Sequence, residues 1–596
     1  MQASDALREL FGFERFRPGQ AEAVSAALAD RDALVVMPTG SGKSLCYQLP
    51  ALMRDDLTLV VSPLVSLMQD QVSALSRVAP GRVELVNSQR GGAANADALE
   101  RAATGEVRLL YVAPERFGLP GFASAVSRLR VGLFVVDEAH CVSQWGHDFR
   151  PDYFALASAA QRLGARATIA LTATATPSVA DDIVRRLALR DPVRVSTGFD
   201  RPNLSFAVVP CATGVDKERR LTAALGEPGA LPAIVYAGTR SMCEELAGVL
   251  GRSLKLGDRV VPYHAGLNRD VRARVQDRFM AGDADVIVAT NAFGMGIDKA
   301  DVRTVAHASV PGSLEAYYQE AGRAGRDGAP ARCLLFAEQR DKGLHVFFIE
   351  RSRVEAESFV RVSERLRWAG ADGVYDVALS ELAGLVDSGG RSRPDAEAVR
   401  AVVGHLARAG FVAPRPAPPD RAVGRIARDW DRGLLGTCVA SAKEAERIRW
   451  NQYRAIWGYV ERAVCRRSAL LAHFGDRSQP HPTVPCCDTC DPAALPAPPV
   501  VASRAPGAAI PATGDLDGAI LDVVVTARPP VGRTRAVEIL RGGRSKVIAQ
   551  YSYDSLDGYG SFAHLRGPDV LARVDELLAD GRLRSTGGKF PKLRAA

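Results

Sequence analysis

Two adjacent carboxylates, Asp137 and Glu138, follow an apolar run over residues 131–136. Such a run is typical of a buried parallel strand, and ligands bind at the carboxyl ends of parallel strands. Carboxylate oxygens are preferred ligands of Mg²⁺, and a neighbouring carboxylate can orient a water molecule for attack on a phosphoryl group. The pair therefore predicts a triphosphate-hydrolysing site, with Asp137 holding Mg²⁺ and Glu138 orienting the water.

A glycine-rich turn upstream supplies a place for the phosphates. It follows the apolar run 33–36, precedes a predicted helix that begins near Leu45, and reads Met37-Pro38-Thr39-Gly40-Ser41-Gly42-Lys43-Ser44. Backbone N–H groups of such a turn bind phosphate oxygens, the lysine neutralises the β and γ phosphates, and the final hydroxyl is a ligand of Mg²⁺. We expect ATP to contact the last six residues, Thr39, Gly40, Ser41, Gly42, Lys43 and Ser44.

The acidic pair is followed closely by a segment rich in aromatic and polar side chains, Gln144-Trp145-Gly146-His147-Asp148-Phe149-Arg150-Pro151. Exposed aromatic rings beside a cation are what single-stranded nucleic acid stacks on. Because the segment lies a few residues from the Mg²⁺ carboxylates, base stacking there can control hydrolysis. We expect nucleic acid to contact Gln144, Trp145, His147, Phe149 and Arg150. The competing interpretation makes Trp145 an ordinary core residue.

Two arginines in the second half of the chain, Arg323 and Arg326, stand among glycines and follow Gln319. Arginines three residues apart share a face of a helical turn. An arginine delivered across a cleft stabilises the charge of a phosphoryl-transfer transition state and raises the rate by about 10³-fold or more. The flanking glycines favour this role over an ordinary solvated surface.

The elements that carry these residues alternate between short apolar runs and helical stretches in two successive parts of the chain. Strand–helix alternation predicts parallel sheets that are covered by helices on both faces. We therefore expect two stacked α/β domains, 1–202 and 203–340, with a cleft between them. The rest of the chain divides into a helical region at 341–491, an Ala/Pro-rich linker at 492–514 and a compact unit at 515–596.

Composition excludes some classes of protein. With 596 residues and a formal net charge of +8, the chain is long enough for several domains and weakly favours a polyanionic partner. No apolar run approaches the roughly 18 residues of a membrane-spanning helix, and the first residues lack the pattern of a secretory leader. Ten cysteines in a chain of this length do not make a disulfide scaffold. We expect an intracellular protein without membrane contact.

The segment 137–151 resembles the aromatic-rich loop of RecQ-family DNA helicases. Further segments resemble motifs of that family in the same order, at residues 11–20, 37–44, 62–71, 171–176, 263–267, 289–299 and 319–328. Met37, which stands where the general phosphate-loop pattern has a glycine, is also typical of the family. The resemblance is close over residues 4–340 and returns at 440–491 and 515–596. It implies an α/β protein with two RecA-like parallel-sheet motor domains, followed by a helical zinc-binding region and a winged-helix domain.

The resemblance assigns further residues of the ATP site. Gln20 is expected to read the adenine edge, with Phe13 and Arg17 on either side of the base. Arg326 is expected to be the arginine that reaches the phosphates, ahead of Arg323. The nucleotide-binding set is completed by Gly296, Asp298 and Gln319.

Family members hold a structural Zn²⁺ with a lone cysteine and a later Cys-x-x-Cys-x-x-Cys segment. Here the position expected for the third ligand is occupied by Val484, which cannot bind metal, and Cys486 is the nearest substitute. Adjacent cysteines on one metal imply a strained local backbone, and His473 or His481 are alternative ligands. We expect a closed structural site with four thiolate ligands, Cys465, Cys486, Cys487 and Cys490.

Residues 515–596 read as three helices and a hairpin, which is the order of a winged helix, and the segment 556–560 resembles the RecQ C-terminal winged domain. Three nearby cations are expected to bind duplex phosphates: Arg541, Arg544 and Lys546. A protein-binding winged helix is the alternative. The helicase-and-RNase-D-like module of many relatives is not expected. Residues 352–435 are longer than expected between motor and zinc region, and predict a winged-helix-like insert.

The resemblance implies an ATP-dependent 3′→5′ DNA helicase that uses ATP, Mg²⁺ and Zn²⁺. It would couple hydrolysis to translocation on single-stranded DNA and to unwinding of duplex or branched DNA in recombination and repair. Expected partners are single-stranded and branched DNA and a single-stranded-DNA-binding protein, and the expected location is cytoplasmic and nucleoid-associated. Two alternatives stay open. One is an RNA helicase, and the other is a DNA-stimulated ATPase or branched-DNA-binding scaffold with weak unwinding.

Overall fold

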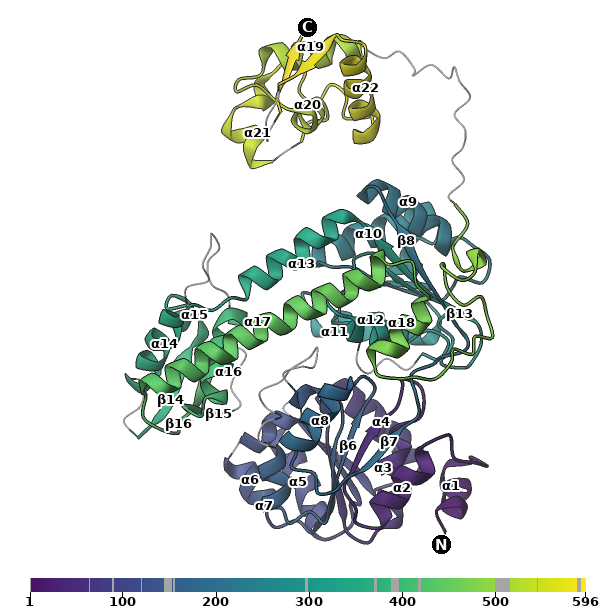
Figure 1. The fold of residues 1–596 in the computed structure, drawn as a ribbon, viewed down its shortest axis with the longest axis vertical. Coiled ribbons are helices and arrows are strands. Elements are labelled where there is room, and N and C mark those ends of the chain that lie inside the picture. The colour runs from purple at the N-terminus through teal and green to yellow at the C-terminus, as the bar shows by residue number, and fades with distance from the viewer. Residues whose placement is uncertain are drawn as a thin grey trace. The chain divides into compact units, whose positions relative to one another are not determined.

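The computed structural model divides the chain into two compact units, residues 1–500 and 501–596 (Figure 1). It describes residues 2–63, 65–87, 90–118, 120–143, 153, 156–294, 299–368, 372–386, 396–415, 420–498, 515–543, 545–586 and 591–596. Among the helices of these described residues, none combines the length and the apolar character that crossing a bilayer requires.

Lobe one, residues 2–196, is built on a seven-stranded sheet in which all strands are parallel, in the order β3-β4-β2-β5-β6-β1-β7. Its strands are β1 (Ala33–Val36), β2 (Leu57–Val61), β3 (Val83–Val86), β4 (Leu109–Val112), β5 (Val131–Val136), β6 (Ala167–Thr172) and β7 (Val193–Ser196). Its helices are α1 (Ala3–Phe11), α2 (Gln20–Leu28), α3 (Leu45–Met53), α4 (Val65–Val78), α5 (Gly92–Ala103), α6 (Pro120–Val126), α7 (Leu156–Arg162) and α8 (Pro177–Arg186).

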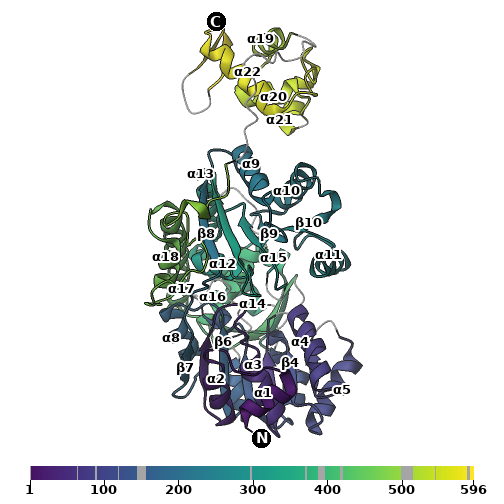
Figure 2. The same ribbon diagram turned by 90° about the vertical axis from the view of Figure 1, so that its right-hand side faces the viewer.

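Both faces of the lobe-one sheet are buried. Successive side chains of a strand point to opposite faces, so Leu34 and Val36 of β1 enter one apolar core while Ala33 and Val35 enter another. Helices α5 to α8 cover the first face, on the left in Figure 1, and α2 to α4 cover the second. Figure 2 views the molecule from the side of α1 to α4. Strands such as β1 are apolar at every position rather than at alternate positions because helices cover both faces of the sheet.

Lobe two, residues 204–337, repeats this arrangement with six parallel strands in the order β10-β11-β9-β12-β13-β8. Its strands are β8 (Leu204–Pro210), β9 (Ala233–Tyr236), β10 (Val260–Tyr263), β11 (Val286–Ala289), β12 (Thr304–His307) and β13 (Ala331–Ala337). Its helices are α9 (Gly214–Leu225), α10 (Arg240–Ser253), α11 (Arg269–Ala281) and α12 (Leu314–Ala321). The two parallel α/β sheets expected from the sequence are confirmed. Residues 197–203, the lobe connector, join β7 to β8.

The helical region packs on lobe two. It contains α13 (Gln339–Arg351), the long α17 (Arg432–Glu461) and α18 (Arg466–His473). Side chains of α17 and α18, including Ile456, Trp457 and Leu470, enter the core on the α12 face of the lobe-two sheet. Because β8 is the edge strand of that sheet, the polypeptide after α18 can pair with it, and Phe206 of β8 forms a parallel bridge with Cys487. The cysteine region therefore covers an edge that would otherwise stay open.

A small unit with its own core stands between α13 and α17. Its elements are α14 (Ala356–Trp368), β14 (Val374–Ala378), α15 (Leu379–Ala383), α16 (Ala396–Arg408), β15 (Val412–Arg415) and β16 (Arg421–Ile426). The three strands are antiparallel in the order β14-β16-β15. This order of elements, a helix, a strand, two helices and two strands, is that of a winged helix.

The C-terminal unit has a separate apolar core. Its elements are α19 (Leu516–Thr526), α20 (Arg533–Leu540), α21 (Lys546–Gln550), α22 (Gly567–Ala579), β17 (Leu583–Ser585) and β18 (Leu593–Ala595). The strands β17 and β18 pair antiparallel, as the hairpin predicted from the sequence requires. The glycines at the centre of that hairpin lie outside the described residues. The terminal hairpin is confirmed, but four α-helices precede it among the described residues where the sequence predicts three.

Candidate active site and zinc site

The glycine-rich turn joins β1 to α3 at the carboxyl end of the lobe-one sheet. Gly40 and Gly42 both have φ of +83°, a left-handed conformation that side chains disfavour. The Lys43 Nζ atom donates to the main-chain carbonyls of Met37 at 3.0 Å and Pro38 at 3.3 Å. Burial lowers the pKa of the Lys43 ammonium, although Glu138 and Asp137 act in the opposite direction. This partly desolvated cation inside a glycine turn fits a phosphate group.

The sequence-predicted adenine residues lie directly against this turn. The Gln20 amide donates to the carbonyls of Ser41 at 3.2 Å and Gly42 at 3.0 Å, and its oxygen accepts from the Arg17 main chain at 2.8 Å. The Arg17 guanidinium donates to the Gly40 carbonyl at 2.8 Å. Phe13 is half exposed, at 51%. Gln20 and Arg17 therefore brace the phosphate turn, and reading of the adenine edge stays a prediction.

Asp137 and Glu138 lie at the carboxyl end of β5, as expected from the apolar run before them. Burial and the neighbouring Glu138 together raise the pKa of Asp137 to about 7, although Lys43 acts in the opposite direction. Glu138 has φ of +47°, which is unusual for a residue with a side chain. Two partly buried carboxylates beside one another favour a cation between them, because a positive charge restores their ionised form. The donor set thus fits Mg²⁺.

Glu138 is connected to the end of β6 through His140. The His140 Nδ1 atom lies 3.3 Å from the Glu138 carboxylate and 3.0 Å from the Thr172 hydroxyl. His140 and Thr172 are both fully buried. Tyr153, which follows the aromatic segment, donates from its hydroxyl to the Asp137 carbonyl at 3.0 Å. The Glu138 carboxylate is therefore linked to the end of β6, and the Asp137 main chain is bound by a residue that closely follows the aromatic segment.

The two arginines after α12 differ in what they contact. A Cβ atom built on Gly40 would lie 3.4 Å from the Arg326 Cγ atom, so the Arg326 side chain lies against the phosphate turn of lobe one. Arg323 is buried within lobe two, where its guanidinium approaches Gly294. This geometry brings Arg326, rather than Arg323, to the site. The role of either arginine in hydrolysis stays a prediction.

Arg201, in the lobe connector, is a site residue that none of the sequence motifs contains. Its guanidinium donates to the carbonyl of Thr39 in lobe one at 3.1 Å and to three carbonyls of the arginine segment in lobe two, those of Gly322, Ala324 and Gly325. The available signal in the sequence was a charged Asp-Arg pair before a proline, between the two predicted domains. That signal is too common to indicate a role.

The remaining predicted site residues lie on α12, in the C-terminal unit or outside the described residues. Gln319 is buried on α12. In the C-terminal unit, the exposed Arg541 donates to the Leu565 carbonyl at 2.8 Å, and α21 begins at Lys546. The predicted residues outside the described part of the chain are Gln144, Trp145, His147, Phe149, Arg150, Gly296, Asp298 and Arg544.

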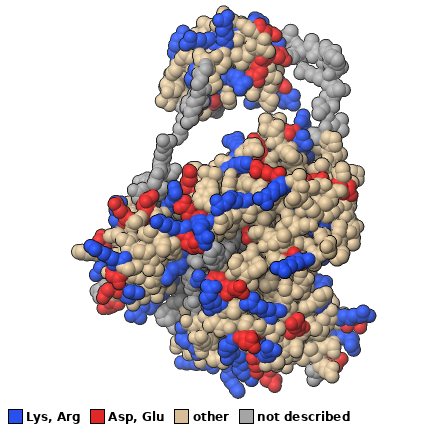
Figure 3. All heavy atoms as spheres, in the orientation of Figure 1, with Lys and Arg blue, Asp and Glu red and all other residues tan. Residues whose placement is uncertain are grey.

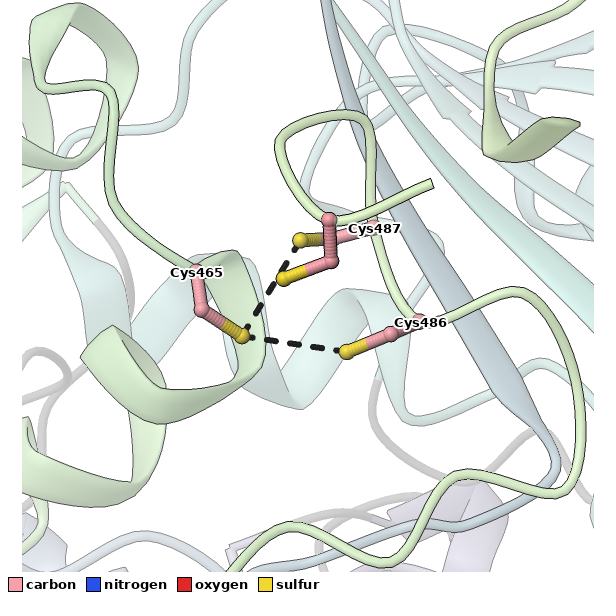
Figure 4. Close-up of side chains that lie close together, drawn as sticks. Cys465, Cys486 and Cys487 are labelled. Atoms are coloured by element: carbon pink, nitrogen blue, oxygen red, sulfur yellow. Dashed lines mark hydrogen bonds between the residues drawn. The ribbon is translucent and has the colours of Figure 1, made fainter. Parts of the chain in front are cut away.

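Four cysteine side chains gather between α18 and the edge of lobe two (Figure 4). Their sulfur atoms all lie within 4.8 Å of one another: Cys465, Cys486, Cys487 and Cys490. The Cys465 sulfur is 3.7 Å from that of Cys486 and 4.0 Å from that of Cys487. Tetrahedral zinc with Zn–S bonds of about 2.3 Å separates its sulfurs by about 3.8 Å. The cluster therefore fits Zn²⁺.

The alternative histidines point elsewhere. The His473 Nε2 atom lies 2.8 Å from the Glu315 carboxylate, and the main chain of His481 donates to Asp200. Neither belongs to the cluster found among the described residues. Neither Cys486 nor Cys487 has a positive φ, and the expected strain at the adjacent cysteines stays a prediction. Cys487 forms an isolated bridge with β8.

Four family models match the chain. They are DEAD/DEAH box helicase at residues 17–183, helicase conserved C-terminal domain at 217–328, RecQ zinc-binding at 426–491 and RQC domain at 518–596. Among solved structures, the crystal structure of DUF1998 helicase MrfA bound to DNA and AMPPNP matches with a TM-score of 0.50 at 17% identity, over 72% of this chain and 62% of that one. That likeness is one of fold alone.

Two proteins of Bacillus subtilis (strain 168) are similar in sequence. ATP-dependent DNA helicase RecQ is 42% identical over 356 residues, which is 59% of this chain and 59% of that protein. Probable ATP-dependent DNA helicase RecS is 34% identical over 488 residues, which is 81% of this chain and 91% of that protein. The chain spans 54–59% of the length of the first three RecQ proteins that it matches. Because the match to RecS extends over nearly all of that relative, and zinc-binding and RQC regions follow two helicase regions in order, the chain belongs to the RecQ family of helicases.

Proposed function

We propose that this protein is an ATP-dependent DNA helicase that moves 3′→5′ along single-stranded DNA and unwinds duplex or branched DNA in recombination and repair. The observation that carries the proposal is the approach of Arg326 in lobe two to the phosphate turn of lobe one. A motor that hydrolyses ATP between two lobes needs cations from both, because the transferring phosphoryl group spreads its charge over three oxygens. Membership of the RecQ family supports the DNA substrate.

The chain's own residues divide the work of hydrolysis. Lys43 and the backbone of the glycine turn would hold the β and γ phosphates, with Gln20 beside the base. Ser44 and Asp137 would hold Mg²⁺, which neutralises phosphate charge when it is bound. Glu138 would orient the attacking water, and Arg326 would stabilise the charge that develops in the transition state.

Contacts of Glu138 and of the Asp137 main chain offer a route by which DNA controls hydrolysis. Glu138 is linked through His140 to Thr172, and the main-chain carbonyl of Asp137 accepts a hydrogen bond from Tyr153. Tyr153 closely follows the aromatic segment that is expected to contact a single strand, and Thr172 belongs to a segment that resembles a motif of the family. If these segments have two arrangements that hold the carboxylates differently, a bound strand changes the balance between them only to the extent that it binds one arrangement more tightly than the other.

A formal net charge of +8 supports a polyanionic partner, and Figure 3 shows Lys and Arg side chains interspersed with Asp and Glu on the face in view. Contacts between such cations and nucleic-acid phosphates would not depend on the base sequence. We infer a cytoplasmic, nucleoid-associated location and a single-stranded-DNA-binding protein as a partner from the proposed substrate. An RNA helicase and a branched-DNA-binding scaffold with weak unwinding are the alternatives.

The proposal is tested by ATPase and strand-displacement assays on matched DNA and RNA partial duplexes with 3′ or 5′ single-stranded tails. We expect unwinding of the DNA duplex that carries a 3′ tail, and little or none of the RNA duplexes. Equal activity on RNA would favour an RNA helicase. DNA-stimulated hydrolysis without strand displacement would favour the scaffold.

Replacing Lys43 by Ala should abolish ATP hydrolysis and unwinding, because the phosphates lose their point charge. DNA binding should survive, since phosphate contacts elsewhere dominate affinity. Lys255→Ala is the control, because Lys255 is an exposed lysine of lobe two away from the site. Unwinding by the Lys43→Ala protein would show that the motor site lies elsewhere.

Trp145→Ala should remove most of the stimulation of ATP hydrolysis by single-stranded DNA, and unwinding with it. Stacking on an aromatic ring contributes about 1–3 kcal/mol per base, which is enough to bias a loop with two arrangements. Basal hydrolysis, melting temperature and overall DNA affinity should stay near those of the unmodified protein. Trp368→Ala is the matched control, because Trp368 is 87% exposed on the small winged unit. Joint loss of melting temperature and basal rate would mean that Trp145 is a core residue.

We propose Cys465, Cys486, Cys487 and Cys490 as the zinc ligands, with Cys486 replacing the ligand that Val484 cannot supply. Metal analysis should give about one zinc per chain. Both Cys486→Ser and Cys490→Ser should lower zinc content and destabilise the region after residue 440, because zinc binding is itself folding free energy. Cys211 is a buried cysteine outside the cluster, so the Cys211→Ser protein should contain as much zinc as the unmodified protein. Full zinc content in Cys486→Ser would remove Cys486 from the set, and a metal-free folded protein would refute the site.

A further inference from the structure

Arg201 is bound on both sides of the boundary between the lobes. One of its terminal nitrogens donates to the Thr39 carbonyl and the Gly322 carbonyl, each at 3.1 Å. The other donates to the carbonyls of Ala324 and Gly325, each at 3.0 Å. In the part of the chain that the structure describes, all four of its hydrogen-bond partners are main-chain carbonyls, and it has no carboxylate partner.

These carbonyls belong to the two segments that must meet for hydrolysis. Thr39 precedes Gly40 in the phosphate turn, and Gly322, Ala324 and Gly325 surround Arg323 and precede Arg326. The two segments touch, because a Cβ atom on Gly322 would lie 3.5 Å from the Thr39 Cβ atom. A planar guanidinium has five donors in a fixed arrangement, so it can fix the distance between two backbones in a way that a single ammonium cannot.

The main chain of Arg201 is itself held from the cysteine region. The buried Arg467 of α18 donates to the Arg201 carbonyl at 2.7 Å and binds the Asp200 carboxylate and the Leu204 carbonyl. On the other side of Asp200, the main chain of Phe199 donates to Asp476 at 2.7 Å. The lobe connector therefore has little freedom, and the Arg201 side chain starts from a fixed position.

We propose that Arg201 is a positioning residue for Arg326, which it sets against the phosphate turn by binding backbone carbonyls of both lobes at once. The inference rests on the proposed function, since it concerns the same ATP site. Arg201 does not touch the phosphates through this arrangement. It acts on the rate by fixing where the arginine segment of lobe two lies.

The first test is a mutational cycle read by steady-state ATP hydrolysis with saturating single-stranded DNA. Arg201→Ala should lower kcat by about 10- to 100-fold, because small displacements of a group that acts in the transition state have effects of this size. KM for ATP should change less than about threefold, since most ground-state contacts come from lobe one. In an Arg326→Ala background, Arg201→Ala should lower kcat by less than about twofold, because residues acting through one another are not additive.

Two further variants separate positioning from simple stabilisation. Arg201→Lys keeps the charge but has a single donor nitrogen. Compared with Arg201→Ala, it should restore part of any loss in melting temperature but little of the loss in kcat. Arg332→Ala is the matched control, because Arg332 is a partly buried arginine that binds Glu227 and the Ala224 carbonyl within lobe two alone. It should leave the KM and kcat of ATP hydrolysis near those of the unmodified protein.

The second test does not depend on activity. Hydrogen–deuterium exchange should become at least about fivefold faster in peptides covering 37–44 and 322–326 in Arg201→Ala, because loss of local hydrogen bonds opens a segment. Peptides of the C-terminal unit should exchange unchanged. Unchanged exchange at both segments, or effects on kcat that multiply with those of Arg326→Ala, would overturn the inference. Absence of DNA-stimulated hydrolysis in the unmodified protein would instead overturn the proposed function, and exchange would still decide the role of Arg201.

Discussion

The contact between the phosphate turn of lobe one and the arginine segment of lobe two is the interaction on which the site depends. Each lobe has its own parallel sheet with one face whose apolar core belongs to that lobe alone, while the other faces of both sheets share a core with α17 and α18. The site, however, is divided between them: Lys43 and the carboxylates belong to one lobe, and Arg326 belongs to the other. A glycine at position 40 matters here, because a side chain would lie in van der Waals contact with Arg326 and would need a left-handed backbone.

The cysteine region acts on this contact indirectly, through the edge of lobe two. Phe206 of β8 donates to the Cys486 carbonyl at 3.2 Å, and Asp488 donates back to Phe206 at 3.1 Å, so the ligand segment pairs with the edge strand as a further strand would. Cys465 stands at the start of α18, whose Arg467 holds the lobe connector. A metal bound by the four thiolates would tie the edge strand, α18 and the connector together.

Much of this architecture could be predicted from the sequence, because its rules are local. Apolar runs such as 131–136 indicate buried parallel strands, and the glycine turn needs only its own residues to bind a phosphate. The roles of Arg201 and Arg467 could not be predicted, because the partners of Arg201 and most of those of Arg467 are backbone carbonyls more than a hundred residues away, and carbonyls leave no mark in a sequence. The same applies to the link from Glu138 through His140 to Thr172.

The choice of carbonyls as partners for Arg201 also has an electrostatic reason. A carboxylate would hold the guanidinium more strongly, but it would cancel a positive charge beside a site that must receive a triphosphate. Neutral carbonyls satisfy the donors and leave the charge in place, although burial then lowers the pKa of the Arg201 guanidinium. Burial lowers the pKa of Lys43 as well, and Arg326 adds to this effect while Glu138 and Asp137 oppose it. The cations of both lobes are thus arranged for a polyanion, and the two partly buried carboxylates for the metal ion that accompanies it.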